Sequence, residues 1–198
     1  MDPRIVRTQG QLRSAVLDLA ATRDLAQISV HDITRRAGVN RATFYQHYRD
    51  KDELVAVTID GLLNEIFEGC APVLAGIDHL RPDDVHPSVA MMFSQVEKRA
   101  ELYRRLIGHG GSAYFIRRFQ ARNEELSIRA FRFLEDSPTS HDHIPMQVRI
   151  RFAASAMLGL INYWLEHGLE ESAEMMATWY WRLVRPVWFV DGTGKDER

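Results

Sequence analysis

The sequence predicts an all-α protein in which a small three-helix domain precedes a larger helical domain. Three observations support this fold class. Apolar residues recur at helical spacing along most of the chain, the stretch from Ile28 to Leu54 contains three helix-start signals, and no segment alternates as a half-buried strand does. With 198 residues the chain is long enough to bury a substantial core.

The first two helices of that stretch are joined by a short glycine turn. Ser29 can cap the first helix while Asp32 answers three residues later, as in a capping box. Gly38 stands where the backbone leaves this helix in a left-handed conformation, and Asn40 caps a second helix over residues 41–48. This arrangement is typical of a helix-turn-helix, whose second helix enters the DNA major groove. On spacing alone, an ordinary helical hairpin fits equally well.

The side chains of the second helix favour DNA over a plain hairpin. Phe44 and Tyr48 are expected to be buried, which leaves an outer face of hydrogen-bond donors and flat rings without a carboxylate. The residues of that face are Arg41, Thr43, Tyr45, Gln46 and His47. Asp50 and Glu53 predict another capping box, which starts a long third helix at Lys51.

Four runs of this stretch resemble the DNA-binding region of the tetracycline-repressor (TetR) family of bacterial transcription regulators. They are Ser29-Val30-His31-Asp32-Ile33, Arg36-Ala37-Gly38-Val39-Asn40, Thr43-Phe44-Tyr45-Gln46-His47-Tyr48 and Lys51-Asp52-Glu53-Leu54. The resemblance covers roughly residues 8 to 60. It implies a dimeric regulator, usually a repressor, with a helical second domain that binds an effector.

We expect the DNA contacts to come from both ends of this motif. Arg41 is well placed to donate two hydrogen bonds to guanine, and a phosphate contact is its alternative role. By the resemblance, Tyr45, His47 and Lys51 hold the phosphate backbone. The predicted DNA-binding residues are Ser29, His31, Arg41, Ala42, Thr43, Tyr45, His47 and Lys51.

Charge and composition agree with a DNA reader attached to a separate body. Residues 1–52 carry nine Lys and Arg against six Asp and Glu, about +3, and the remainder carries about −5, giving −2 overall. A chance fluctuation would explain so small a difference equally well. The single cysteine, Cys70, excludes an internal disulfide and fits a reducing cytosol. Without a signal-like N-terminus or a long apolar run, we expect a soluble, cytoplasmic protein that has no membrane partner.

The predicted organisation is a DNA-binding domain over residues 1–52, a helical effector-binding and dimerisation domain over residues 53–190, and a disordered tail over residues 191–198. Residues 1–7 are expected to form a loose arm. Helices are expected at about 8–24, 51–75, 88–107, 112–135, 146–167 and 172–190, in addition to the two of the glycine-turn motif. Pro145 is placed in the first turn of its helix.

Soft, bulky side chains in the second domain predict a cavity for an apolar or aromatic effector. The predicted effector-binding residues are Phe67, Met91, Met92, Phe93, Tyr103, Tyr114, Phe115 and Phe119. The alternative interpretation is that these side chains form ordinary core.

The last two helices carry more apolar surface than one neighbour needs to cover, which predicts a homodimer through a four-helix bundle. The predicted interface residues are Ala153, Ala156, Met157, Leu160, Ile161, Trp164, Met176, Trp179, Tyr180, Leu183 and Val187. The alternative is that all of them are intrachain core.

Other chemistry finds little support in the sequence. His141-Asp142-His143 lies in a polar loop without further ligands, and the glycine-rich run 108–111 lacks the strand and helix context of a nucleotide site, so it is expected to be a turn. Cys70 on an apolar helix is expected to be buried and inert. We therefore predict no enzyme, no cofactor and no metal.

Together with the resemblance, which implies repression and release by an effector, the sequence predicts a dimeric repressor released from a palindromic double-stranded DNA operator by a small, largely apolar or aromatic effector. Two alternatives remain open. One is an effector-independent architectural DNA binder, and the other is a helical small-molecule-binding protein whose DNA domain no longer functions.

Overall fold

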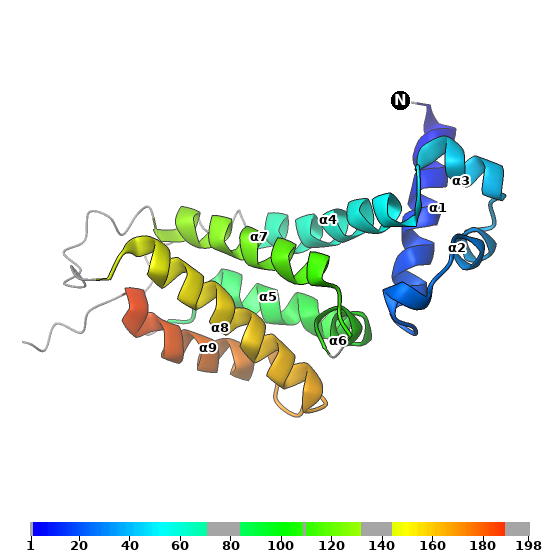
Figure 1. Cartoon of the computed structure of the whole chain (residues 1–198). Helices are drawn as coiled ribbons and strands as arrows, with labels where there is room; N and C mark the ends of the chain where they lie inside the picture. The colour runs from blue at the N-terminus through cyan, green and yellow to red at the C-terminus, as the bar shows by residue number, and fades with distance from the viewer. Residues whose placement is uncertain (1, 71–83, 109, 132–143, 189–198) are drawn as a thin grey trace, which may run out of the picture. The chain divides into compact units, whose positions relative to one another are not determined.

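The computed structural model describes residues 2–70, 84–108, 110–131 and 144–188, and every regular element in these ranges is a helix (Figure 1). The predicted all-α fold class is confirmed. The chain divides into two compact units, an N-terminal unit of residues 1–65 and 99–118 and a C-terminal unit of residues 66–98 and 119–198. The N-terminal unit therefore extends well past residue 52, the boundary predicted for the DNA-binding domain. The predicted tail, residues 191–198, lies outside the described ranges.

The N-terminal unit contains α1, several shorter helices and the beginnings of α4 and α7. They are α1 (Pro3–Ala20), the 3₁₀ helix η1 (Leu25–Gln27), α2 (Val30–Ala37), α3 (Arg41–His47), α4 (Lys51–Cys70) as far as Glu65, α6 (Ala100–Ile107) and the start of α7 (Ala113–Phe131).

Helix α1 begins five residues earlier than predicted. The Asp2 carboxylate accepts a hydrogen bond from the Arg4 amide at 2.8 Å, and Pro3 occupies the first turn, where its missing amide costs nothing. The expectation of a loose arm over residues 1–7 was wrong, because these start signals outweigh the polarity of the segment.

The predicted turn between α2 and α3 is confirmed in detail. The Ser29 hydroxyl oxygen accepts a hydrogen bond from the Asp32 amide at 3.2 Å, and the Asp32 carboxylate accepts one from the Ser29 amide at 3.0 Å. Gly38 ends α2 at φ +68°, the left-handed conformation that glycine adopts without steric cost. Asn40 caps α3 by accepting a hydrogen bond from the Thr43 amide at 2.7 Å.

Helix α4 starts with a variant of the predicted capping box. The Asp50 carboxylate accepts from the Glu53 amide at 2.9 Å, as expected. The Glu53 carboxylate, however, accepts from the Arg49 amide at 2.6 Å instead of from the Asp50 amide. The return bond thus reaches one residue further back and also fixes the segment that leaves α3.

One apolar core holds α1 to α4 together. Phe44 is completely buried, and its ring lies 5.2 Å from that of Tyr45 and 6.0 Å from that of Tyr48 between centroids. The other side chains buried in this core are Leu12, Ala15, Val16, Ala20, Ile28, Ile33 and Leu54. Burial of Phe44 and Tyr48 fixes which face of α3 is turned outward.

The C-terminal unit contains the rest of α4 and α7 together with α5 (Pro87–Lys98), α8 (Met146–Glu166) and α9 (Ala173–Trp188). Helix α5 packs along α9, which also packs along α8 (Figure 1). The single helix predicted over residues 88–107 is wrong, because Arg99, at φ −132° and ψ 38°, interrupts it and separates α5 from α6. Pro145 precedes α8 at ψ 138° and so lies just outside the first turn in which it was predicted.

Aromatic side chains dominate the core of the C-terminal unit. The rings of Phe93 and Trp164 meet edge to face at 5.8 Å, and the Trp164 indole donates a hydrogen bond to the Glu171 carbonyl at 2.8 Å. The Tyr180 hydroxyl donates to the Ala153 carbonyl at 3.1 Å. The polar groups of both side chains are thus hydrogen-bonded, as buried tryptophan and tyrosine require. The two bonds hold α8 against α9 and against the segment that precedes α9.

Candidate nucleic-acid interface and ligand cavity

The outward side of α3 carries no acidic side chain. Arg41, Ala42, Tyr45 and Gln46 are exposed, whereas Thr43 and His47 are half-buried. Asn40 caps the N-terminus of the helix, and Phe44 anchors its inner side. The result is a short, rigidly held helix that presents donors and an aromatic ring to solvent.

The Arg41 side chain packs against Tyr45, which lies one turn later on the same helix. The guanidinium carbon is 5.5 Å from the centre of the Tyr45 ring, and a terminal nitrogen donates a hydrogen bond to the Tyr45 hydroxyl at 3.2 Å. This bond engages one of the five N–H donors of the guanidinium, which keeps others for a further partner. Its planar form suits either partner, because guanidinium groups stack on rings and also pair with guanine in two-bond geometry.

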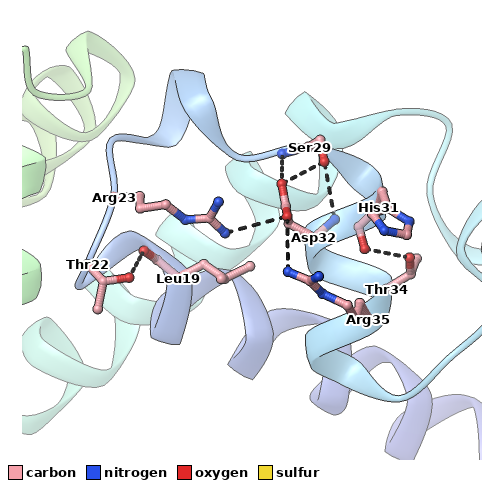
Figure 2. A network of polar contacts seen from close by, with 8 residues as sticks. All are labelled: Leu19, Thr22, Arg23, Ser29, His31, Asp32, Thr34 and Arg35. Atoms are coloured by element: carbon pink, nitrogen blue, oxygen red, sulfur yellow. Dashed lines mark hydrogen bonds and ion pairs between the residues drawn. The ribbon is translucent and has the colours of Figure 1, made fainter.

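A polar network surrounds the start of α2, and Figure 2 shows it from close by. The Asp32 carboxylate accepts hydrogen bonds from the Ser29 hydroxyl at 2.7 Å and from the Ser29 amide at 3.0 Å. The Thr34 hydroxyl donates to the His31 carbonyl at 3.1 Å. Both donors of Ser29 are therefore engaged within the protein, which confirms the predicted cap, while the predicted phosphate contact of this residue stays a prediction.

Two arginines gather at the same carboxylate. Arg23 lies 3.7 Å and Arg35 lies 3.6 Å from Asp32 (Figure 2). The hydrogen bonds from Ser29, followed by the charges of the two arginines, hold the pKa of Asp32 below its usual value. The exposed ends of both arginines thus concentrate positive charge at the N-terminus of α2. Arg23 was not among the predicted DNA-binding residues, and its pairing with Asp32 depends on the fold.

Of the remaining predicted DNA-binding residues, Lys51 is bonded within the protein and His31 is exposed. The Lys51 ammonium donates to the Leu25 carbonyl at 3.0 Å, which ties the start of α4 to η1 and leaves two further donors. His31 is exposed at the start of α2. All eight predicted residues lie in the N-terminal unit, on α3, at the start of α2 and at the start of α4.

The side chains predicted to bind an effector are divided between the two compact units. Tyr103, Tyr114 and Phe115 belong to the N-terminal unit, where the Tyr114 hydroxyl donates to Asp60 at 3.2 Å. Those in the C-terminal unit are Phe67, Met91, Met92, Phe93 and Phe119, of which all but Met91 are buried. The burial of most of this set agrees with the alternative of ordinary core, and the effector site made of these residues stays a prediction.

A different group of residues lines a cavity of about 40 Å³ in the C-terminal unit. Its walls are His86, Ser88, Val89, Met92, Asn123, Leu126, Ser127, Met157, Tyr180 and Trp181. Of the predicted effector-binding residues, Met92 alone lines this cavity. The polar members were missed because no local pattern distinguishes a histidine or asparagine that faces a cavity from one that faces solvent.

The predicted dimer residues fall into two groups. Six of them are already buried within the single chain, namely Ala153, Met157, Ile161, Trp164, Met176 and Tyr180. Leu183 is 71% exposed, and the other four, Ala156, Leu160, Trp179 and Val187, are half-buried. The first group is intrachain core, so the surface open to a partner is narrower than predicted and includes exposed side chains that the sequence analysis did not name.

The predicted burial of Cys70 is confirmed, and its low reactivity stays a prediction. Burial raises the pKa of the Cys70 thiol to about 11, and its sulfur donates to the Ser88 carbonyl at 3.6 Å. Within the described ranges, no three potential His, Cys, Asp or Glu metal ligands lie together. The run 141–143 lies outside those ranges.

Of the helices that the structure describes, none has the length and apolarity that crossing a bilayer requires.

A capped helix-turn-helix followed by a second helical unit is the architecture of a DNA-binding regulator, and this chain has it. The family described as "Bacterial regulatory proteins, tetR family" matches residues 12–58, and "Transcriptional regulator C-terminal region" matches residues 83–185. The chain belongs to the TetR family of transcriptional regulators. Members of this family are regulators and not enzymes, and they are typically repressors with an N-terminal DNA-binding part and a C-terminal ligand-binding part.

Known proteins resemble the chain over most of its length. An uncharacterized HTH-type transcriptional regulator of Bacillus subtilis (strain 168), YxbF, is 28% identical over 186 residues, which is 89% of this chain and 44% of the relative. The chain thus spans less than half the length of that relative.

Two solved structures share the fold. A TetR transcriptional regulator from Streptococcus agalactiae 2603V has a TM-score of 0.70 at 22% identity and covers 92% of this chain and 96% of its own. NalD of Pseudomonas aeruginosa, the secondary repressor of the MexAB-OprM multidrug efflux pump, has a TM-score of 0.67 at 20% identity, with coverages of 93% and 97%. At these identities both structures support the fold alone.

Proposed function

We propose that this protein is a homodimeric repressor that binds a palindromic DNA operator through α3 and is released by a small, largely apolar or aromatic effector. The observation that carries the proposal is the outer face of α3. This face lacks carboxylates, presents Arg41 and Tyr45, and is held by the Asn40 cap and by the buried Phe44. Donors without neighbouring acidic groups suit the acceptor-rich edge of a guanine and the phosphates beside it.

The proposed contacts divide between sequence readout and phosphate binding. Arg41 leaves the Tyr45 ring and donates to guanine O6 and N7, while Tyr45, His47 and Lys51 contact phosphates. Thr43 and Ala42 approach a base edge or the backbone. At the start of α2, Ser29 maintains the cap, and His31, Arg23 and Arg35 contribute donors and charge to a second phosphate site.

The proposed dimer surface runs along α8 and α9. Phe152, Ala156, Leu160 and Tyr163 follow helical spacing on α8, with Phe152 57% exposed. Met175, Trp179, Leu183 and Val187 do the same on α9.

The two stripes meet at an apolar groove of about 330 Å³. Its walls are Ile144, Val148, Arg149, Phe152, Pro186 and Val187. Apolar surface of this kind is characteristic of interaction sites, and a second copy of the same stripe would complete a four-helix bundle. A dimer of this kind would place two α3 helices about one DNA turn apart, roughly 34 to 36 Å.

Effector binding in the C-terminal unit would act through α4, which runs through both units. A tilt of this helix would change the separation of the two recognition helices. The effector can shift that equilibrium only by the difference between its affinities for the two shapes.

The test is fluorescence anisotropy on labelled DNA from upstream of the protein's own coding sequence, against a shuffled copy, over a salt series. Arg41→Ala should weaken operator binding by about 5- to 150-fold, which corresponds to ~1 to 3 kcal/mol of lost discrimination, and should leave binding to the shuffled DNA nearly unchanged. Arg117→Ala is the matched control, since Arg117 is exposed and belongs to α7 and not to the recognition helix α3.

Other outcomes would favour the alternative functions. Equal, salt-dependent binding to both DNAs and to sequences selected from a random library would favour an architectural DNA binder. Absence of binding to any member of the library would favour a small-molecule-binding protein whose DNA domain no longer functions.

A further inference from the structure

The cavity in the C-terminal unit has apolar walls interrupted by three buried polar side chains, His86, Ser88 and Asn123. His86 is 6% exposed and Asn123 is 4% exposed, and both line the cavity. Val89, Met92, Leu126 and Met157 supply apolar wall, and the Trp181 ring lies 6.1 Å from the His86 ring between centroids. Among the described residues, the cavity wall contains no Lys, Arg, Asp or Glu.

Hydrogen bonds from Ser88 fix the tautomer of His86. The imidazole Nδ1 accepts from the Ser88 amide at 3.1 Å and lies 2.7 Å from the Ser88 hydroxyl. A backbone amide can only donate, so Nδ1 carries no proton. Burial lowers the pKa of His86 and keeps the ring neutral. The remaining proton is therefore on Nε2, which is a donor.

This Nε2 donor has no partner among the described residues, and the same is true of the Asn123 side-chain nitrogen. Buried donors are seldom left unpaired, because the hydrogen bond lost to water must be replaced. Two unpaired donors on the walls of one cavity, from the residue before α5 and from α7, indicate that a hydrogen-bond acceptor belongs between them.

We infer that this cavity binds a small neutral molecule through a carbonyl oxygen, which accepts hydrogen bonds from His86 Nε2 and from the Asn123 amide. This inference rests on the proposed function, since it names the effector class. A carbonyl oxygen has two lone pairs and can accept from both donors at once. A carboxylate would be buried beside described wall residues that include no cation, which is unfavourable for a buried charge. An ammonium group is itself a hydrogen-bond donor and could not pair with the two unpaired donors, His86 Nε2 and the Asn123 side-chain nitrogen.

The size of the cavity limits the ligand. About 40 Å³ holds a carbonyl group with a short apolar body. Met92 and Met157 border it, and their flexible thioether side chains can repack around a larger body.

The direct test compares three four-carbon probes on the full chain by NMR: 2-butanone, butanoate and butylammonium. Observed signals are the Asn123 side-chain amide and the His86 Nε2 proton. We expect 2-butanone to shift both signals with saturation at millimolar concentration, and to bind at least tenfold more tightly than the two charged probes. Tighter binding of butanoate or butylammonium would overturn the carbonyl assignment. A lack of saturable shifts with 2-butanone at 50 mM would mean that the donors hold water only, and would also overturn it.

A pair of variants tests the role of Asn123. Asn123→Leu should raise the dissociation constant of 2-butanone at least tenfold. Asn162→Leu is the control, because Asn162 lies on α8 outside the cavity and donates to Glu166 at 3.0 Å. Equal affinities in the two variants would contradict the inference. The signal shifts in the unmodified protein keep the test decisive if Asn123→Leu fails to fold.

Failure of this inference is distinguishable from failure of the proposed function. Probe binding is measured without DNA, whereas operator binding and its loss in Arg41→Ala are measured without a probe. If 2-butanone binds but leaves operator affinity unchanged, the carbonyl site stands and release by a ligand at this cavity is refuted.

Discussion

Replacing Ser29 by alanine separates its two possible roles, a helix cap and a phosphate contact. The Ser29 hydroxyl accepts from the Asp32 amide at 3.2 Å and donates to the Asp32 carboxylate at 2.7 Å. The bond from the Ser29 amide to the same carboxylate, 3.0 Å, does not depend on the side chain. Ser29→Ala therefore removes two of the three bonds that close the first turn of α2.

The expected cost follows from this count. Loss of a side-chain cap typically destabilises a helix by about 1 kcal/mol. Helix α2 has only 8 residues, so it has little other local support. A change of about 1 kcal/mol raises the open population of α2 roughly fivefold. The Ile33 amide donates to the Ser29 carbonyl at 3.1 Å, so it reports on the opening of this turn. Its hydrogen-exchange rate, measured by NMR, should rise roughly fivefold.

Two variants control the experiment. Ser29→Thr retains a hydroxyl and should keep the Ile33 amide protected, while Ser14→Ala makes the same chemical change at an exposed position of α1 and should leave α2 unaffected. The salt dependence of DNA binding supplies the opposing result. If Ser29→Ala left exchange in α2 unchanged but weakened DNA binding at every salt concentration, with the slope of log K against log salt unaltered because a neutral hydroxyl releases no counterion, a phosphate contact would have been lost and the capping argument would be refuted.

Two further predictions concern the dimer surface and Cys70. Leu183 is 71% exposed, so Leu183→Glu should leave each chain folded while it places a charge in the proposed interface. Sedimentation velocity should then show a shift toward monomer. Arg182→Glu, at the neighbouring exposed position, is the control. A dimer unaffected by Leu183→Glu would exclude this stripe as the interface. The pKa of Cys70 is about 11 against an ordinary 9.0, so its thiolate population at pH 8 is about a hundredfold lower, and modification by a thiol reagent should be correspondingly slow in native protein and rise toward pH 11. Reaction at the rate of the unfolded chain would contradict this burial.

The sequence predicted the DNA-reading motif well because its signals are local. The Ser29 cap, the left-handed Gly38 and the Asn40 cap each act over three or four residues, so their consequences can be derived without knowledge of the rest of the fold. Burial of Phe44 followed from helical periodicity, and with it the outward face of α3. The start of α1 at Pro3 was not predicted, because residues 1–7 are polar, although the Asp2 cap that starts the helix is a local signal.

The C-terminal unit was predicted less well because its properties depend on packing. Helical periodicity continues through Arg99, yet the backbone turns there, since α5 packs along α9 while α6 belongs to the N-terminal unit. Met92 and Phe93 are adjacent in sequence and equally buried, but Met92 lines the cavity and Phe93 packs on Trp164. No pattern in a single sequence separates these two roles.

The sequence by itself determined the all-α class, the helix-turn-helix with its caps, and the outer face of α3 that carries Arg41 and Tyr45. These follow from hydrogen bonds and periodicities that extend over one or two helical turns. Only the tertiary structure decided which apolar residues of α8 and α9 are core and which remain open to a partner. It also brought His86 and Asn123 to one cavity, because the residues that meet there come from α7 and the start of α5, and long-range packing alone determines that they meet.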